Sequence, residues 1–255
     1  MSPDILLHEY SQRELQGAIA LIGFPSVGLV SSIAASYIVK NLKLERVASM
    51  VSPEFPPYTL IYDGVPSPPI RFYAGERMCG ADGEQCEQLV VITAEFMPKP
   101  ELIKPVADMI LDWCRSKGIE TIITLEGMNS GMDPQEAKTL CVANGEGCES
   151  MVETYDLEEM NEGMISGISG VLLYEADRLG DEVLCLLGPA KSNFPDARGA
   201  ARLLEIVGKM LPELKLDPDP LYREAEEIEQ QMKTSMDGIQ QQPRPLSDGG
   251  SMLYG

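Results

Sequence analysis

The feature of this sequence that most constrains its fold is the alternation of short apolar runs with longer segments of helical periodicity. Residues Gln16–Ile22 are of strand length and end in a continuous apolar run, which is typical of a strand buried on both faces. A turn over Gly23–Gly28 follows, with Ser26 as the expected helix N-cap. Apolar residues then recur at helical spacing, at Val27, Val30, Ile33, Ala34, Tyr37 and Ile38. The pattern predicts a strand, a tight turn and a helix.

The same alternation continues along the chain. Further strands are predicted at Arg46–Val51, Glu87–Thr93, Ile119–Leu125, Thr139–Ala143 and Glu182–Leu187. Helices are predicted at Pro98–Lys117, Gly163–Leu179 and Asp196–Leu211, the last with Asp196 as its N-cap. Thr59–Tyr62 and Ile70–Ala74 are expected to pair as a hairpin. Strands that alternate with helices predict an α/β fold, with a mostly parallel sheet flanked by helices.

The chain changes character after Pro212. Residues 1–215 carry the alternating pattern and are predicted to form one α/β core domain. Residues 216–238 are predicted to form a C-terminal helix with an apolar seam at Leu221, Ala225, Ile228 and Met232. This helix can dock on its own domain or contact a second subunit. Residues 239–255 are mostly polar and rich in Pro and Gly, so we predict a disordered tether.

The net charge argues against two classes of partner. The chain carries 40 acidic residues against 20 basic ones, a formal net charge of −20. Nucleic-acid phosphates would repel such a protein, and no basic stripe offsets the repulsion. The longest apolar runs are too short to span a bilayer, and the N-terminus lacks the pattern of a signal peptide. We therefore expect a cytoplasmic protein that binds neither nucleic acid nor membrane.

The histidine and cysteine residues limit the chemistry further. His8 is the one histidine, so any catalytic triad or multi-histidine metal site would have to use it. Two cysteine pairs, Cys79 with Cys86 and Cys141 with Cys148, share a spacing longer than that of zinc knuckles. We expect free thiols rather than disulfides or metal ligands, because the cytosol is reducing. No metal ion or cofactor is predicted.

Glycine clusters form two candidate sites. The turn from Gly23 to Gly28 precedes a helix, but it matches neither the Walker A motif nor the dinucleotide-binding fingerprint. It is predicted to be a tight turn, with phosphate binding as the alternative. Gly163, Gly167 and Gly170 are predicted to allow close packing, which includes contact with another subunit, and a ligand loop is the alternative.

The last three residues, Leu253, Tyr254 and Gly255, carry the sharpest signal in the sequence. A hydrophobic residue, a tyrosine and any final residue resemble the C-terminal docking motif of proteasome-binding activators and chaperones. An apolar side chain and an amphipathic tyrosine can fill a pocket, while the terminal carboxylate pairs with a lysine. A flexible tether would leave this tail accessible.

Several segments taken in order resemble the proteasome-assembly-chaperone-2 family, and in particular its archaeal members. They are Gly23–Lys40, Glu54–Pro57, Ile70–Tyr73, Gly163–Leu173, Phe194–Asp196 and Ala200–Ala201. The resemblance covers roughly residues 5–230. It implies a sheet akin to that of purine nucleoside phosphorylases, homo-oligomerisation and no enzymatic active site. It also implies that Leu253, Tyr254 and Gly255 engage α subunits of the proteasome core particle. The loops that carry the paired cysteines depart from the family pattern.

An alternative function is a nucleoside- or phosphate-binding enzyme with a nucleoside-phosphorylase-like fold. Such an enzyme would use the loops around Gly23–Gly28, Glu95 and Glu126, because ligands of α/β folds bind at strand ends. The single histidine and the lack of a basic cluster near the glycine turns count against this alternative.

Overall fold

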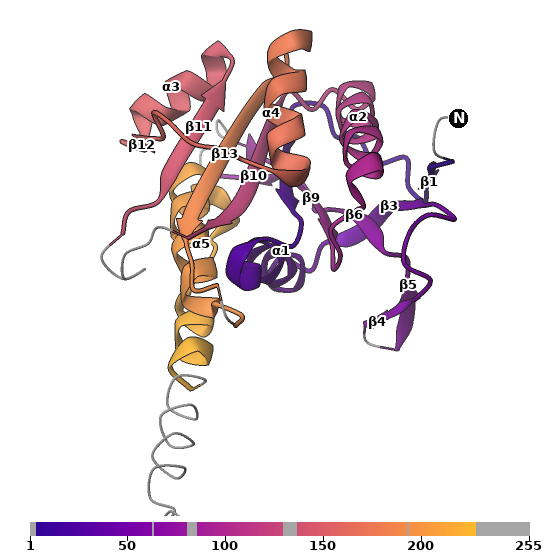
Figure 1. The fold of residues 1–255 in the computed structure, drawn as a ribbon, viewed down its shortest axis with the longest axis horizontal. Coiled ribbons are helices and arrows are strands. Elements are labelled where there is room, and N and C mark those ends of the chain that lie inside the picture. Colours follow the sequence, from indigo (N-terminus) through magenta and orange to yellow (C-terminus); the bar gives the residue numbers. More distant parts are fainter. Residues whose placement is uncertain (1–3, 63, 81–85, 130–136, 193, 228–255) are drawn as a thin grey trace, which may run out of the picture.

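A sheet of nine strands organises the chain. We describe it from a computed structural model that covers residues 4–62, 64–80, 86–129, 137–192 and 194–227 (Figure 1). Across the sheet, the strands follow the order β1 (Leu6–Glu9), β3 (Glu45–Val51), β6 (Ile70–Ala74), β9 (Leu89–Ala94), β2 (Ile19–Gly23), β10 (Thr121–Met128), β13 (Glu182–Pro189), β11 (Leu140–Asn144) and β12 (Glu158–Glu159).

The four central strands, β9, β2, β10 and β13, run parallel to one another. Every residue of β9 is buried, and so is every residue of β13 after Glu182. The sequences of such strands are continuous apolar runs, because helices cover both faces of the strands and both sets of side chains are buried. The flanking pairs β1–β3, β3–β6, β6–β9 and β13–β11 are antiparallel. The predicted α/β class is confirmed, and the parallel part is the centre of a mixed sheet.

Helices cover the two faces of the sheet (Figure 1). On one face, α1 (Val30–Asn41) packs against α5 (Ala197–Met210), and α3 (Glu146–Thr154) buries Cys148 and Val152 in the same apolar cluster. On the other face, α2 (Pro100–Ser116) packs against α4 (Gly167–Leu179). The sequence analysis did not predict α3, whose first turn includes a glycine that weakens the helical pattern.

The predicted hairpin between Thr59–Tyr62 and Ile70–Ala74 is wrong. Strand β4 (Leu60–Tyr62) pairs instead with β5 (Val65–Ser67), while β6 lies in the main sheet between β3 and β9. Tyr62 lies opposite Val65, so only two residues separate the paired ends, and such short turns favour glycine at positive φ. Gly64 has a φ of +79°. Figure 1 shows this hairpin projecting away from the body.

The C-terminal part of the described chain is anchored to the body. After the short helix η2 (Pro212–Leu214), residues 219–227 are helical, and Leu221 and Ala225 are 3% and 5% exposed. Leu221 joins the apolar cluster of α1 and α5, as expected for a helix docked on its own domain. Ile228, Met232 and the predicted tether 239–255 lie outside the described residues. No helix in the described part of the chain is long and apolar enough to cross a membrane.

Asp196 ties the start of α5 to two loops, as its predicted N-cap role requires. Its carboxylate accepts hydrogen bonds from the backbone N–H of Gly199 at 2.9 Å and of Lys191 at 2.9 Å. Its own backbone N–H donates to the carbonyl of Gly28 at 2.8 Å. Asp196 is 5% exposed, so water cannot readily replace these bonds.

Replacing Asp196 with alanine should lower the free energy of unfolding by about 2 kcal/mol, because two buried backbone donors lose their acceptor. Urea denaturation of the full chain measures the change. Asp177→Ala provides a matched control, since Asp177 is exposed on α4; its effect should stay within about 0.5 kcal/mol. Equal losses in the two variants would contradict the capping role.

Candidate functional site

The carboxyl ends of the parallel strands bring several predicted residues to one edge of the sheet. Gly23 ends β2, Glu95 directly follows β9, and Glu126 lies near the end of β10. Because β2 pairs with both β9 and β10 in parallel register, these three positions are neighbours along that edge. This is where α/β folds place ligand sites.

Gly23 and Gly28, at the two ends of the first turn, allow the backbone of the turn to lie close to neighbouring segments. A Cβ added to Gly23 would lie 2.5 Å from the Cβ of Ala35 and 2.7 Å from the carbonyl oxygen of Ser31, both in α1. Gly28 has a φ of +63°, and a Cβ there would lie 2.7 Å from the carbonyl oxygen of Lys191. Both glycines therefore serve packing. Whether they also serve a ligand or a second subunit stays a prediction.

Helix α1 begins later than its periodicity predicted. A short 3-10 helix, η1 (Val27–Leu29), precedes it, and the predicted N-cap Ser26 makes no capping hydrogen bond. The hydroxyl of Ser26 instead pairs with that of Ser31 at 2.6 Å and accepts from the backbone N–H of Gly127 at 3.0 Å. The N-cap prediction is wrong because this side chain fastens the turn to β10.

Glu126 forms a partly buried acid–hydroxyl pair with Ser169. Ser169, in the first turn of α4, donates a hydrogen bond of 2.7 Å to Oε1 of Glu126. Burial raises the pKa of Glu126 to about 7, and the bond from Ser169 opposes part of that rise. The pair can thus hold or release one proton near neutral pH. The sequence analysis identified Glu126 from its strand-end position but not Ser169.

Glu95 forms an ion pair with Arg71, which the sequence analysis did not identify as a site residue. Both terminal nitrogens of the Arg71 guanidinium bind the Glu95 carboxylate, and Nη1 donates to Oε2 at 2.8 Å. Nη1 also donates to the carbonyl of Pro68 at 3.1 Å. Arg71 is 1% exposed, whereas the Glu95 side chain is 28% exposed. The sequence signal that could have identified Arg71 is the presence of an arginine in the otherwise apolar strand β6.

The second glycine cluster lies around the start of α4. Gly163 and Gly170 line a shallow pocket of about 410 Å³ together with residues of β11. Gly167 has a φ of +73°, and a Cβ there would lie 3.1 Å from the terminal methyl of Met97. The helix begins at Gly167 rather than at Gly163 as predicted. Met164, between these glycines, is 90% exposed.

The cysteine prediction was wrong for one pair. Cys79 and Cys86 form a disulfide, because β7 (Met78–Cys79) and β8 (Cys86–Glu87) pair with these residues directly opposite, with their Cα atoms 4.0 Å apart. Cys141 and Cys148 are free, as expected; both are buried, and burial raises their thiol pKa values to about 11 and about 12. The described residues contain no group of three metal-ligating side chains.

The remaining predicted residues lie elsewhere. His8 is exposed on the edge strand β1, where it pairs with Ser49 of β3, away from the carboxyl ends of the parallel strands. Leu253, Tyr254 and Gly255 lie outside the described residues. The strand ends thus carry two side-chain pairs: Glu126 with Ser169, which can hold a proton, and Arg71 with Glu95, which form an ion pair.

The raised pKa of the partly buried Glu126 predicts a specific pH dependence of stability. Glu126 ionises near its ordinary pKa of 4.5 in the unfolded chain but only near about 7 in the folded one. Its contribution is therefore fully present below pH 4.5 and is lost as the pH rises through 7. The Glu126→Gln variant stays neutral, so it should gain stability relative to the parent chain between pH 5 and pH 8, by roughly 2 kcal/mol.

Chemical denaturation across this pH range measures the difference. Glu120→Gln removes an exposed carboxylate directly before the same strand and serves as the control; its profile should parallel that of the parent chain. A Glu126→Gln profile that also ran parallel would contradict the raised pKa.

Comparison with known proteins confirms the family resemblance. The chain matches the model of the PAC2 family over residues 20–236. An uncharacterised protein of Methanocaldococcus jannaschii is 29% identical over 225 residues, which is 88% of each chain. The crystal structure of Pyrococcus furiosus PbaA, described as an archaeal homologue of proteasome-assembly chaperone, is 31% identical and has a TM-score of 0.80, covering 93% of both chains.

A second Pyrococcus furiosus structure is also similar. PbaB, described as an archaeal proteasome activator, is 25% identical with a TM-score of 0.78, over 92% of this chain and 100% of its own. The match in sequence pattern and the match in fold cover the same α/β body. The chain therefore belongs to the PAC2 family.

Proposed function

We propose that this chain is a non-enzymatic, chaperone-like protein that binds the α ring of the proteasome core particle through Leu253, Tyr254 and Gly255. The proposal rests on the similarity in fold to PbaA and PbaB. PbaA is described as an archaeal homologue of proteasome-assembly chaperone, and PbaB as an archaeal proteasome activator. In this proposal, the side chains of Leu253 and Tyr254 and the terminal carboxylate make the contact with the core particle. The proposed location is the cytoplasm.

The described part of the chain supports a tail that is presented away from the body. Leu221 and Ala225 anchor residues 219–227, and the hydroxyl of Tyr222 donates to Glu205 of α5 at 2.8 Å. Glu224, Glu226 and Glu227 are exposed. In Figure 1 this helical segment runs past the lower end of α5 and beyond the body. A tail that continues from this point can reach a partner without rearrangement of the core.

The charge of the chain makes a local contact the best mechanism. With 40 acidic against 20 basic residues, the body as a whole offers little general attraction to a protein partner. A leucine and a tyrosine can instead bury apolar surface in a pocket, and a terminal carboxylate can pair with a lysine beside it. The acidic faces would then limit binding to wrong partners.

Homo-oligomerisation would strengthen this contact. A single short tail binds weakly, because it buries little surface and must be ordered on binding. Several tails on one assembly raise the effective concentration of the second and later tails, so that the whole binds far more tightly than one tail does. We therefore propose that a homo-oligomer is the form that engages the core particle.

Deleting residues 253–255 should weaken binding to a cognate core particle at least tenfold, since every group of the proposed contact is removed. Co-sedimentation of the full chain and the truncated chain with core particles measures this loss. Met252→Ala is the matched control, because it changes an apolar residue of the same tail outside the proposed contact; it should bind like the parent chain.

A second variant tests the role of the terminal carboxylate. Two serines added after Gly255 leave Leu253 and Tyr254 in place but move the carboxylate away from them. This extension should weaken binding as well. If the truncated and extended chains both sedimented with core particles like the parent chain, the proposed contact would be refuted.

A further inference from the structure

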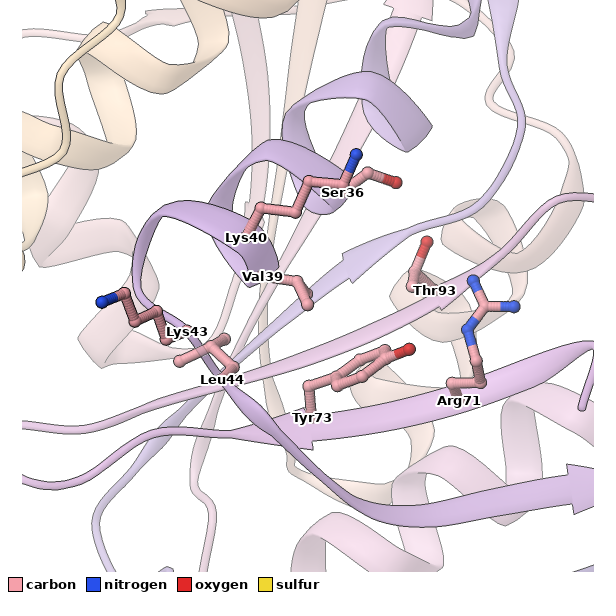
Figure 2. Close-up of a pocket in the computed structure, with 8 residues that line it drawn as sticks. All are labelled: Ser36, Val39, Lys40, Lys43, Leu44, Arg71, Tyr73 and Thr93. Atoms are coloured by element: carbon pink, nitrogen blue, oxygen red, sulfur yellow. The ribbon is translucent and has the colours of Figure 1, made fainter. Parts of the chain in front are cut away.

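A pocket of about 410 Å³ lies between α1 and the face of strands β6 and β9 (Figure 2). Its volume falls within the range of small-molecule sites. Tyr73, α1 and α5 belong to one apolar cluster, so the pocket lies on the face of the sheet that α1 and α5 cover. It shares Arg71 with the ion pair at the strand ends, but it does not involve the C-terminal tail, so it is independent of the proposed function.

The charge of this pocket is opposite to that of the protein. Lys40 lies in the last turn of α1, Lys43 follows the end of that helix, and Arg71 comes from β6. None of the described residues that line the pocket is acidic, although acidic residues outnumber basic ones by 40 to 20 in the chain. The C-terminal end of a helix favours nearby cations, which accounts for the lysines but not for the arginine buried in a strand.

Arg71 is held in a fixed position. Its guanidinium binds the carboxylate of Glu95 through both terminal nitrogens, and Nη1 donates to the carbonyl of Pro68. This ion pair leaves the two lysines as the net positive charge of the site. A fixed guanidinium beside two exposed lysines suits an anion, since little side-chain entropy is lost on binding at the fixed group.

The rest of the lining supplies hydroxyl and apolar groups. Figure 2 shows the hydroxyl of Tyr73 at the end of its ring nearest Arg71, with Thr93 on the neighbouring strand above it. The hydroxyl of Thr93 donates to the carbonyl of Gly23 at 2.8 Å, so its oxygen remains an acceptor toward the pocket. Val39 and Leu44 form the apolar wall beside the Tyr73 ring. A flat ring fits against that wall.

We propose that this pocket binds a small organic anion, in which a phosphate or carboxylate group lies at the end of the pocket that Lys40 and Arg71 line, and a flat ring lies against Tyr73, Val39 and Leu44. The cations attract the charged group, and they do so strongly because field lines concentrate in a recess with low-dielectric walls. The ring contributes through burial of apolar surface.

Isothermal titration calorimetry of the full chain at low salt tests the site with four probes. Adenosine monophosphate and phenylacetate carry both the ring and the anion, and they distinguish a phosphate from a carboxylate ligand. Adenosine lacks the charge, and inorganic phosphate lacks the ring. At least one of the two complete probes should bind, and adenosine and inorganic phosphate should each bind at least tenfold more weakly.

The double variant Lys40→Gln/Lys43→Gln should weaken binding of the complete probe about tenfold, because two attractive charges are lost. Both residues are exposed, so the variant should fold like the parent chain. Lys209→Gln/Lys215→Gln removes the same charge from two other exposed positions and should leave the affinity unchanged.

Three results would overturn the proposal. The first is that neither complete probe binds the parent chain at millimolar concentration. The second is that the Lys40→Gln/Lys43→Gln variant binds like the parent, which would place the ligand elsewhere. The third is that no probe binds while the same variant changes the mass of the native assembly, which would make the pocket a contact between copies of this chain.

Discussion

The structure depends on four parallel strands that are buried on both faces. Strand β9 has no exposed residue, and β13 is buried from Val183 onward. Strands of this kind are stable only when helices cover each face, because their side chains are apolar on both sides. Helices α1, α3 and α5 on one face and α2 and α4 on the other meet that need. The carboxyl ends of these strands, with Gly23, Glu95 and Glu126, are consequently gathered at one edge.

Close approach of backbone segments is the second requirement of this architecture. Gly23 allows α1 to lie on β2, and Gly28 lets the following turn pass beside the loop before α5. Ser26 and Asp196 then fasten these segments through side-chain bonds to Gly127, Lys191 and Gly199. The small residues of the strand ends thus have a structural use, and the cationic pocket forms between α1 and strands β6 and β9.

Local pattern predicted most of the elements but not their long-range partners. The apolar runs identified the central strands, and the N-cap at Asp196 was read directly from sequence. The partner of Thr59–Tyr62 was wrong, because apolar alternation alone does not state which strand pairs with which. Ser26 failed as an N-cap because β10, distant in sequence, offered its hydroxyl a backbone donor. The Cys79–Cys86 disulfide was missed because free thiols were expected from a reducing cytosol, and the two-residue strands that place these cysteines opposite each other carry almost no periodic signal.

The same distinction holds for the candidate sites. Glu95 and Glu126 were found because they follow apolar runs, whereas Arg71 and Ser169 became recognisable only through their partners. The pocket between α1 and β6 unites Lys40 with Arg71, and no spacing rule connects two positions so far apart on different elements. The tail Leu253–Gly255 is the opposite case, since its proposed role depends on a local motif and not on tertiary structure.

The central claim is that this member of the PAC2 family binds the proteasome core particle as a homo-oligomer. Native mass spectrometry of the full chain, alone and mixed with a cognate core particle, tests it most directly. The account predicts a mass that is a multiple of one chain for the protein alone, and a new species equal to the core particle plus that assembly in the mixture. A monomeric mass and an unchanged core particle in the mixture would contradict it.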